Sequence, residues 1–117
     1  MNRLIHLLRS QTAYNLHSPY LYRLYTQVVA PHRRDFSALA LALREWSSAH
    51  HADISATEAR LIGPDGELLL LRSPHSSAES EARLARLYDH YPVSLDLYHT
   101  ILLIRNPKLH PQRFLLR

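Results

Sequence analysis

Histidine and serine are adjacent at His17 and Ser18, and a histidine that takes a proton from a serine hydroxyl creates a nucleophile. Neighbouring residues rarely reach the geometry for that transfer, and Ser18 is better explained as the N-cap of a helix that begins at Pro19. We therefore predict no catalytic residue. We interpret His17, Ser18 and Tyr20 as candidate ligand-binding residues, with a purely structural turn into the helix as the alternative.

The other groups that carry chemistry favour structural roles. The chain has nine histidines, but no H-x-x-x-H pattern occurs, and His50 and His51 would point about 100° apart on a helix. We predict no metal site. Asp96 stands between apolar residues of an expected strand, where it either faces solvent or bonds a neighbouring loop.

The charge of the chain raises the question of anionic partners. Its net charge is +4 and its pI is about 9.8. Thirteen of the fourteen basic residues are arginine, whose planar fork fits phosphate and carboxylate. The arginines are scattered along the sequence, which favours a solvated surface over a binding patch. A nucleic-acid partner is not expected, although a nucleic-acid-binding module stays a second alternative.

Length and composition indicate one folded domain over residues 1–117, with a helical part at 1–51 and a β-rich part at 55–117. The chain has no cysteine, so it has no disulfide framework, which fits a reducing cytoplasm. No apolar run is long enough to cross a bilayer, and the start does not resemble a signal peptide. We predict a cytoplasmic protein without a membrane partner.

The first half of the chain predicts helices. A helix is expected at 2–12, a second at 19–29 that Pro31 ends, and a third at 35–48 with Asp35 as its N-cap. Ser55–Glu58 (SATE) matches a capping box, which predicts a helix of one or two turns.

The second half predicts a β-α-β-β unit. The continuous apolar run in the strand at 66–72 indicates burial on both faces. A helix is expected at 76–91, with a capping box that begins at Ser76, and a long strand at 93–105. That strand has one wet face in its first half and a bend near His99. The strand at 112–117 closes a hairpin.

The predicted fold is α/β, with N-terminal helices packed on a small mixed sheet of three strands. Such a sheet leaves the strand at 66–72 at an edge, without a charge or proline to protect it. We therefore predict a homodimer in which two copies pair antiparallel through 66–72.

The order of these elements and several local motifs resemble class I S-adenosylmethionine-dependent methyltransferases. Residues 15–22 (NLHSPYLY) are similar to the H-S-P-[FY] segment that opens a group of bacterial methyltransferase-like proteins. Residues 36–46 resemble that group's leading helix, and residues 93–104 with 112–117 its closing hairpin. The resemblance covers 11–48 and 55–117. It implies a Rossmann-like ancestry in which the last strand inserts antiparallel between the other two.

The cofactor-binding part of that family is missing. Its members hold the cofactor with a glycine-rich loop, whereas this chain has only Gly63 and Gly66 and no G-x-G. We predict that S-adenosylmethionine does not bind. The sequence favours a non-catalytic, methyltransferase-like remnant that acts through protein contacts. The alternative is a methyltransferase that is active only with a partner chain supplying the cofactor half.

Overall fold

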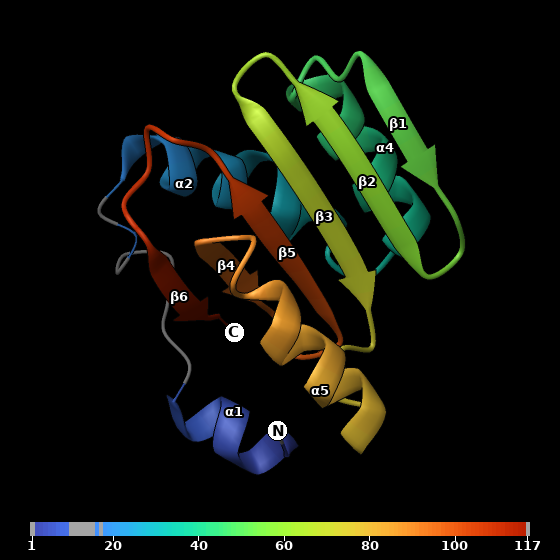
Figure 1. Cartoon of the computed structure of the whole chain (residues 1–117), viewed down its shortest axis with the longest axis vertical. Helices are drawn as coiled ribbons and strands as arrows, with labels where there is room; N and C mark the ends of the chain where they lie inside the picture. Colours follow the sequence, from blue (N-terminus) through green and yellow to red (C-terminus); the bar gives the residue numbers. More distant parts are fainter. Residues whose placement is uncertain (1, 10–15, 17, 117) are drawn as a thin grey trace.

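The computed structural model describes residues 2–9, 16 and 18–116, and of residues 7–9 the backbone alone. One face of a six-stranded sheet carries α5 (Ala78–Leu87), and the other face carries α2 (Pro19–Leu24) and α4 (Phe36–Trp46) (Figure 1). The helix α1 (Arg3–Arg9) lies below one end of the sheet in this view. The mixed α/β class is confirmed.

The sheet has the order β1-β2-β3-β5-β4-β6. Three antiparallel strands come first, and β3 and β4 are both antiparallel to β5, so they run parallel to each other and are connected through α5. The last strand, β6, pairs parallel with β4. The strands are β1 (His51–Ile54), β2 (Glu58–Gly63), β3 (Gly66–Arg72), β4 (Val93–Asp96), β5 (Thr100–Arg105) and β6 (Gln112–Leu115).

The predicted three-stranded sheet is wrong, and two of the additional strands lie where a loop and a short helix were expected. The predicted capping box at Ser55 is the turn of the β1–β2 hairpin. The Ser55 hydroxyl oxygen accepts hydrogen bonds from the backbone N–H groups of Thr57 and Glu58, at 3.3 and 3.1 Å. A serine bonds the backbone two or three residues ahead in a turn as readily as at a helix start, so the pattern did not distinguish the two.

The predicted long strand at 93–105 is two strands joined by a tight turn. Tyr98 has a φ of 73°, in the left-handed region, and reverses the chain between β4 and β5. The antiparallel strand between the two others is therefore β5. Residues 112–115 lie instead at the sheet edge, parallel to β4. The predicted hairpin of 93–105 with 112–117 is wrong.

The predicted dimer through residues 66–72 is also wrong in its premise. The strand β3 is paired along both sides, with β2 and with β5, so no free edge remains there. The edges of the sheet are β1 and β6.

The apolar core lies on both faces of the sheet, as the run of leucines predicted. Leu68 and Leu70 pack in the larger cluster with the N-terminal helices, whereas Leu69 and Leu71 pack in a second cluster with Leu84 of α5. The expected wet face at 93–96 is absent, because Ser94 and Asp96 are buried.

Side-chain caps start the helices where the sequence predicts, with small shifts. Asp35 caps α4, whereas α5 is capped by Ser77, one residue after the predicted Ser76. The second helix does not end before Pro31. It widens into the π-helix η2 (Tyr25–Val29) and continues as α3 (Ala30–His32), which fits a proline that cannot donate the usual hydrogen bond. In the described ranges no helix has the length and apolarity that a membrane crossing requires.

Candidate functional site

An arginine-lined cavity of about 520 Å³ lies where β3 ends and β5 begins. Its arginines come from three separate segments. Arg3 belongs to α1, Arg33 and Arg34 lie between α3 and α4, and Arg72 is the last residue of β3. The remaining lining residues are Phe36, Leu97, His99 and Thr100.

Neutral groups hold three of these arginines in place. The guanidinium carbon of Arg3 lies 5.1 Å from the ring centre of Tyr98. Arg33 donates to the Tyr25 hydroxyl at 3.2 Å, and Arg72 donates to the carbonyl of Ala56 at 3.5 Å. A ring face, a hydroxyl and a carbonyl orient a guanidinium without cancelling its charge.

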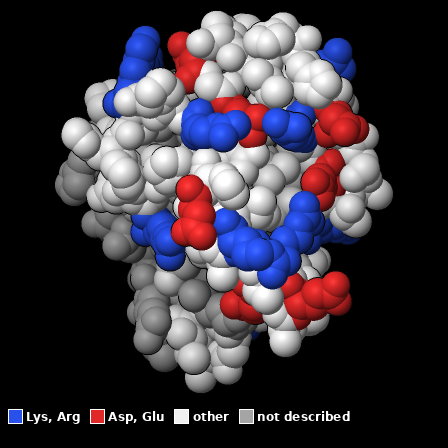
Figure 2. Space-filling view, in the orientation of Figure 1, with Lys and Arg blue, Asp and Glu red and all other residues white. Residues whose placement is uncertain are grey.

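Three arginines outside the cavity are neutralised by carboxylates. Arg60 and Arg105 pair with Glu67, and Arg83 pairs with Glu58, all at 2.9–3.2 Å. Figure 2 shows basic and acidic side chains next to each other on the face that carries α5. In the arginine-lined cavity, by contrast, no guanidinium forms an ion pair with a described carboxylate, and no acidic residue lines the wall. The cavity is a concentrated positive site.

A buried ionic cluster stands beside the cavity. His75 donates from Nε2 to Asp96 at 2.6 Å and from Nδ1 to Glu81, and the side chains of His75 and Asp96 are only 3% and 1% exposed. Burial alone would lower the pKa of His75, but the bonds to Asp96 and Glu81 outweigh it and raise this pKa above its usual 6.5. Both ring nitrogens of His75 face carboxylate oxygens, an arrangement that favours the protonated ring.

The cluster also anchors α1, which brings Arg3 to the cavity. His6 is 1% exposed, and its Nε2 donates to the backbone carbonyl of Asp96 at 3.0 Å. The ring of Tyr98 lies edge-on to His6 and stacks on His75, with centroid distances of 5.4 and 5.3 Å. The position of Arg3 over Tyr98 therefore depends on this packing.

Strained backbone marks the two loops that build this end of the sheet. Ser73, directly after β3, has a φ of 53°, and Tyr98, in the turn between β4 and β5, has a φ of 73°. Non-glycine residues in this region cost free energy, and they cluster at functional sites. The backbone N–H of Ser73 donates to the His99 carbonyl at 2.7 Å, which fixes the two loops to each other.

These residues suit the binding of an anion and do not suit proton transfer. Arginine forks bind phosphate oxygens through parallel hydrogen bonds. His75 cannot act as a general base, because both of its nitrogens are engaged as donors. Among the residues that the structure describes, no group of three histidine or acidic side chains is arranged to hold a metal ion.

The predicted ligand-binding residues are not at this cavity. Ser18 caps α2 by accepting from the Leu21 N–H at 3.3 Å, as its structural interpretation requires. Tyr20 lines a different cavity at the other end of β3 and β5, and His17 lies outside the described residues. Asp96 does bond a neighbouring loop, through His75.

Sequence reasoning missed the arginine-lined cavity because its members are distant in the chain. The pair Arg33–Arg34 is recognisable as a short basic segment before α4. Arg3 and Arg72 give no local signal, and only the fold brings all four together.

Comparisons with known proteins place the chain in no family: no protein-family model, curated protein or solved structure matches it. The resemblance to methyltransferases stays a prediction.

Proposed function

We propose that this protein is a non-catalytic binding protein that holds a phosphate-bearing ligand in the arginine-lined cavity. The observation that carries the proposal is that four guanidinium groups line one cavity and none is paired with a described carboxylate. Like charges that line one cavity repel, and a bound anion relieves this repulsion.

A phosphate or pyrophosphate group fits this site better than a single carboxylate. Each phosphate oxygen can accept from an arginine fork, and a multiply charged group can engage guanidinium groups from different sides of the cavity. The volume of about 520 Å³ lies within the usual range for small-molecule sites, so it also accommodates more than the anionic group itself.

The absence of catalysis is part of the proposal. Two observations support it: the best-placed histidine is locked between carboxylates, and the chain lacks the G-x-G of a cofactor loop. Descent from a methyltransferase remains our hypothesis for its origin. The sheet gives this hypothesis no support, because residues 112–115 lie at the edge and parallel to β4 instead of inserting antiparallel between two strands.

Isothermal calorimetry with inorganic pyrophosphate at low ionic strength tests the proposal. We expect saturable binding to the wild type. Arg34→Gln and Arg72→Gln should each weaken it about tenfold, because a hydrogen bond to a charged group contributes roughly 1.5–3 kcal/mol. The Arg34 side chain forms no hydrogen bond or ion pair with another described residue, so its replacement should leave the unfolding midpoint unchanged.

Arg83→Gln is the matched control, because Arg83 is paired with Glu58 on the α5 side of the molecule and lies outside the cavity. It should bind pyrophosphate like the wild type. Failure of the wild type to bind at millimolar pyrophosphate would overturn the proposal. Equal effects of Arg34→Gln, Arg72→Gln and Arg83→Gln would show that only net charge matters.

A second candidate function is binding of a nucleic-acid backbone. The exposed His99 at the cavity wall lies edge-on to Tyr98, with a centroid distance of 5.1 Å, and such rings can stack on bases beside bound phosphates. Titration with single-stranded RNA across salt concentrations tests it. A steep loss of affinity with salt would favour this candidate, and a flat response would count against it.

S-adenosylmethionine is the ligand that tests the predicted loss of methyltransferase function. We expect no binding tighter than about millimolar in the same calorimeter, because the chain has no glycine-rich cradle for this cofactor. A micromolar dissociation constant would instead favour the alternative in which a partner chain completes an active enzyme.

A further inference from the structure

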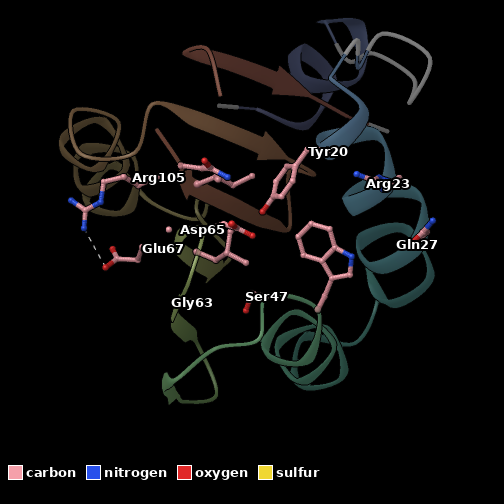
Figure 3. A pocket seen from close by; sticks show the side chains of 13 residues that line it. Tyr20, Arg23, Gln27, Ser47, Gly63, Asp65, Glu67 and Arg105 are labelled. Carbon is pink, nitrogen blue, oxygen red and sulfur yellow. Dashed lines mark ion pairs between the residues drawn. The ribbon is translucent and has the colours of Figure 1, made fainter. Parts of the chain in front are cut away.

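A second cavity, of about 290 Å³, lies at the opposite end of β3 and β5 from the arginines (Figure 3). Its walls come from the start of α2, the end of α4, the β2–β3 turn and the end of β5. Since a water molecule occupies about 30 Å³ in the liquid, the cavity has room for roughly ten non-hydrogen atoms. That is the size of one bicyclic ring system.

The two glycines of the chain fix the rim of this cavity. A Cβ at Gly63 would collide with the carbonyl oxygen of Ser47, and a Cβ at Gly66 would collide with that of Arg105. Gly66 also has a φ of 145°, which side-chain-bearing residues rarely adopt. The β2–β3 turn is therefore pressed against the end of α4 and the end of β5, and the cavity is preformed.

Aromatic rings form one wall. Tyr20 and Trp46 meet edge to face with a centroid distance of 5.0 Å and an interplanar angle of 66°. Both residues line the cavity, and Figure 3 shows the Tyr20 ring bordering it, while Arg23 and Gln27 stand at its outer side. A flat ligand can pack against such rings with little loss of conformational freedom.

The polar groups of the cavity include a hydrogen-bond donor for a ligand, the Tyr20 hydroxyl. Burial raises the pKa of Tyr20, the hydrogen bond with Asn106 partly offsets this rise, and the nearby charge of Asp65 adds to it, so the phenol keeps its proton at neutral pH. Asn106 Oδ1 accepts from the Lys108 N–H at 3.0 Å, which leaves the amide N–H₂ to face the Tyr20 oxygen. The Tyr20 hydroxyl hydrogen is then available to a ligand acceptor.

Asp65 supplies an acceptor next to this donor. Its carboxylate forms no hydrogen bond or ion pair with a described residue, and Figure 3 shows it beside the Tyr20 hydroxyl. The other acid, Glu67, is already occupied by Arg60, Arg105 and the Tyr91 hydroxyl. A carboxylate accepts best from two adjacent N–H groups.

From these groups we infer that the second cavity binds a neutral purine ring that presents adjacent N–H donors beside a carbonyl acceptor, the edge that guanine carries. The carboxylate of Asp65 takes the ring N–H and the amino group, the Tyr20 hydroxyl donates to the carbonyl, and the ring packs against Trp46. Adenine lacks this edge, and hypoxanthine lacks the amino donor.

Fluorescence provides a direct test, because Trp46 is the only tryptophan of the chain and lines the cavity. Titration of the protein with guanosine should quench this emission in a saturable way. Guanosine should bind about tenfold more tightly than inosine or adenosine, since each charge-assisted hydrogen bond that is lost costs about that factor. Equal affinities for the three nucleosides, or no saturation at millimolar guanosine, would overturn the inference.

Two variants separate the assigned roles from folding. Asp65→Asn and Tyr20→Phe should each weaken guanosine binding about tenfold. Arg34→Gln, in the arginine-lined cavity, should leave guanosine binding unchanged. If neither Asp65→Asn nor Tyr20→Phe changes the guanosine affinity, the inference is wrong. Pyrophosphate should not compete with guanosine, so failure of this site and failure of the arginine-lined cavity are distinguishable.

Discussion

The two ends of β3 and β5 hold cavities that differ in charge and in the way they are supported. One end carries four arginines that form no ion pair with a described carboxylate, beside the buried cluster of His6, His75 and Asp96. The other carries an aromatic pair and a turn pressed into place by Gly63 and Gly66. A strand of seven residues separates them by about 20 Å, so they are independent in chemistry.

The two cavities differ in charge, and they also differ in the interactions that hold their walls in place. Arginines repel one another, and the position of Arg3 depends on a buried ionic cluster that lies beside the cavity and not in its wall. The second cavity holds one free carboxylate, and tight backbone packing is sufficient to shape it. Changes to the ionic cluster should therefore affect the arginine-lined cavity alone, and changes to the glycines the second cavity alone.

Asp96→Ala should have the largest effect. It removes the buried carboxylate that His75 and the Tyr98 N–H bond, and breaking a buried ion pair costs about 3–5 kcal/mol of folding free energy. Pyrophosphate binding should weaken as well, because Tyr98 no longer holds Arg3 in place. Urea unfolding and calorimetry measure the two effects. Asp89→Ala, an exposed acid, is the control and should change stability by less than about 0.5 kcal/mol.

Gly66→Ala should damage the opposite end. The left-handed backbone and the collision with the Arg105 carbonyl predict a loss of about 2–3 kcal/mol. Urea unfolding measures the loss, and Pro64→Ala in the same turn is the control. The quenching of Trp46 by guanosine should be lost, whereas pyrophosphate binding should persist. Loss of both ligands together would show that the two ends are not independent.

The pH dependence of stability should originate at the ionic cluster. The pKa of His75 is raised in the folded state, so its contribution is complete below the usual value of 6.5 and is lost as pH rises through the folded value. Burial would raise the pKa of Glu81, but the bond to His75 helps to lower it below 4.5. The contribution of Glu81 is therefore present above 4.5 and is lost as pH falls through its folded value. The cluster stabilises most between these two limits.

The urea midpoint of the wild type should accordingly be higher at about pH 6 than at about pH 9. His75→Gln should remove this difference, and His99→Gln, at an exposed residue, should retain it. A wild-type midpoint that is the same at both values would contradict a charged His75.

Ser18→Ala should have the smallest effect of the series. It removes the cap of α2 and should cost about 1 kcal/mol. Binding of guanosine and of pyrophosphate should be unchanged, because Ser18 lines neither cavity. A variant that melts like the wild type but loses guanosine binding would restore Ser18 as a ligand-binding residue.

Local features of the fold could be predicted where one residue type has one physical role. The leucines at 68–71 indicate burial on both faces, and Ser18 and Asp35 fit N-caps because their oxygens accept from the backbone N–H three residues ahead. The S-x-x-E pattern at Ser55 predicted a helix wrongly, because the serine hydroxyl accepts the same backbone hydrogen bonds in the β1–β2 turn. The chain reversal at Tyr98 was not predicted, because the turn contains no glycine or proline to indicate it.

The candidate site could be predicted least well. Tyr20 stays a predicted ligand-binding residue, and the cavity that it shares with Trp46 and Asp65 requires the tertiary fold. The arginines of the other cavity are separated by up to about seventy residues, and the sequence contains nothing that distinguishes them from the paired arginines. Charge pairing is a property of the folded surface, and composition does not reveal it.

A nitrogen–proton correlation spectrum recorded during a titration with pyrophosphate tests the central claim most directly. The account predicts shifts at the backbone amides of Arg3, Arg33, Arg34, Arg72 and the Leu97–Thr100 turn, with those of Tyr20, Trp46 and Asp65 unchanged. Subsequent addition of guanosine should shift the amide signals of Tyr20, Trp46 and Asp65 and leave those of the arginine-lined cavity unchanged. Shifts spread evenly over all exposed arginines, or confined to the Tyr20 end, would contradict the assignment of the anion site.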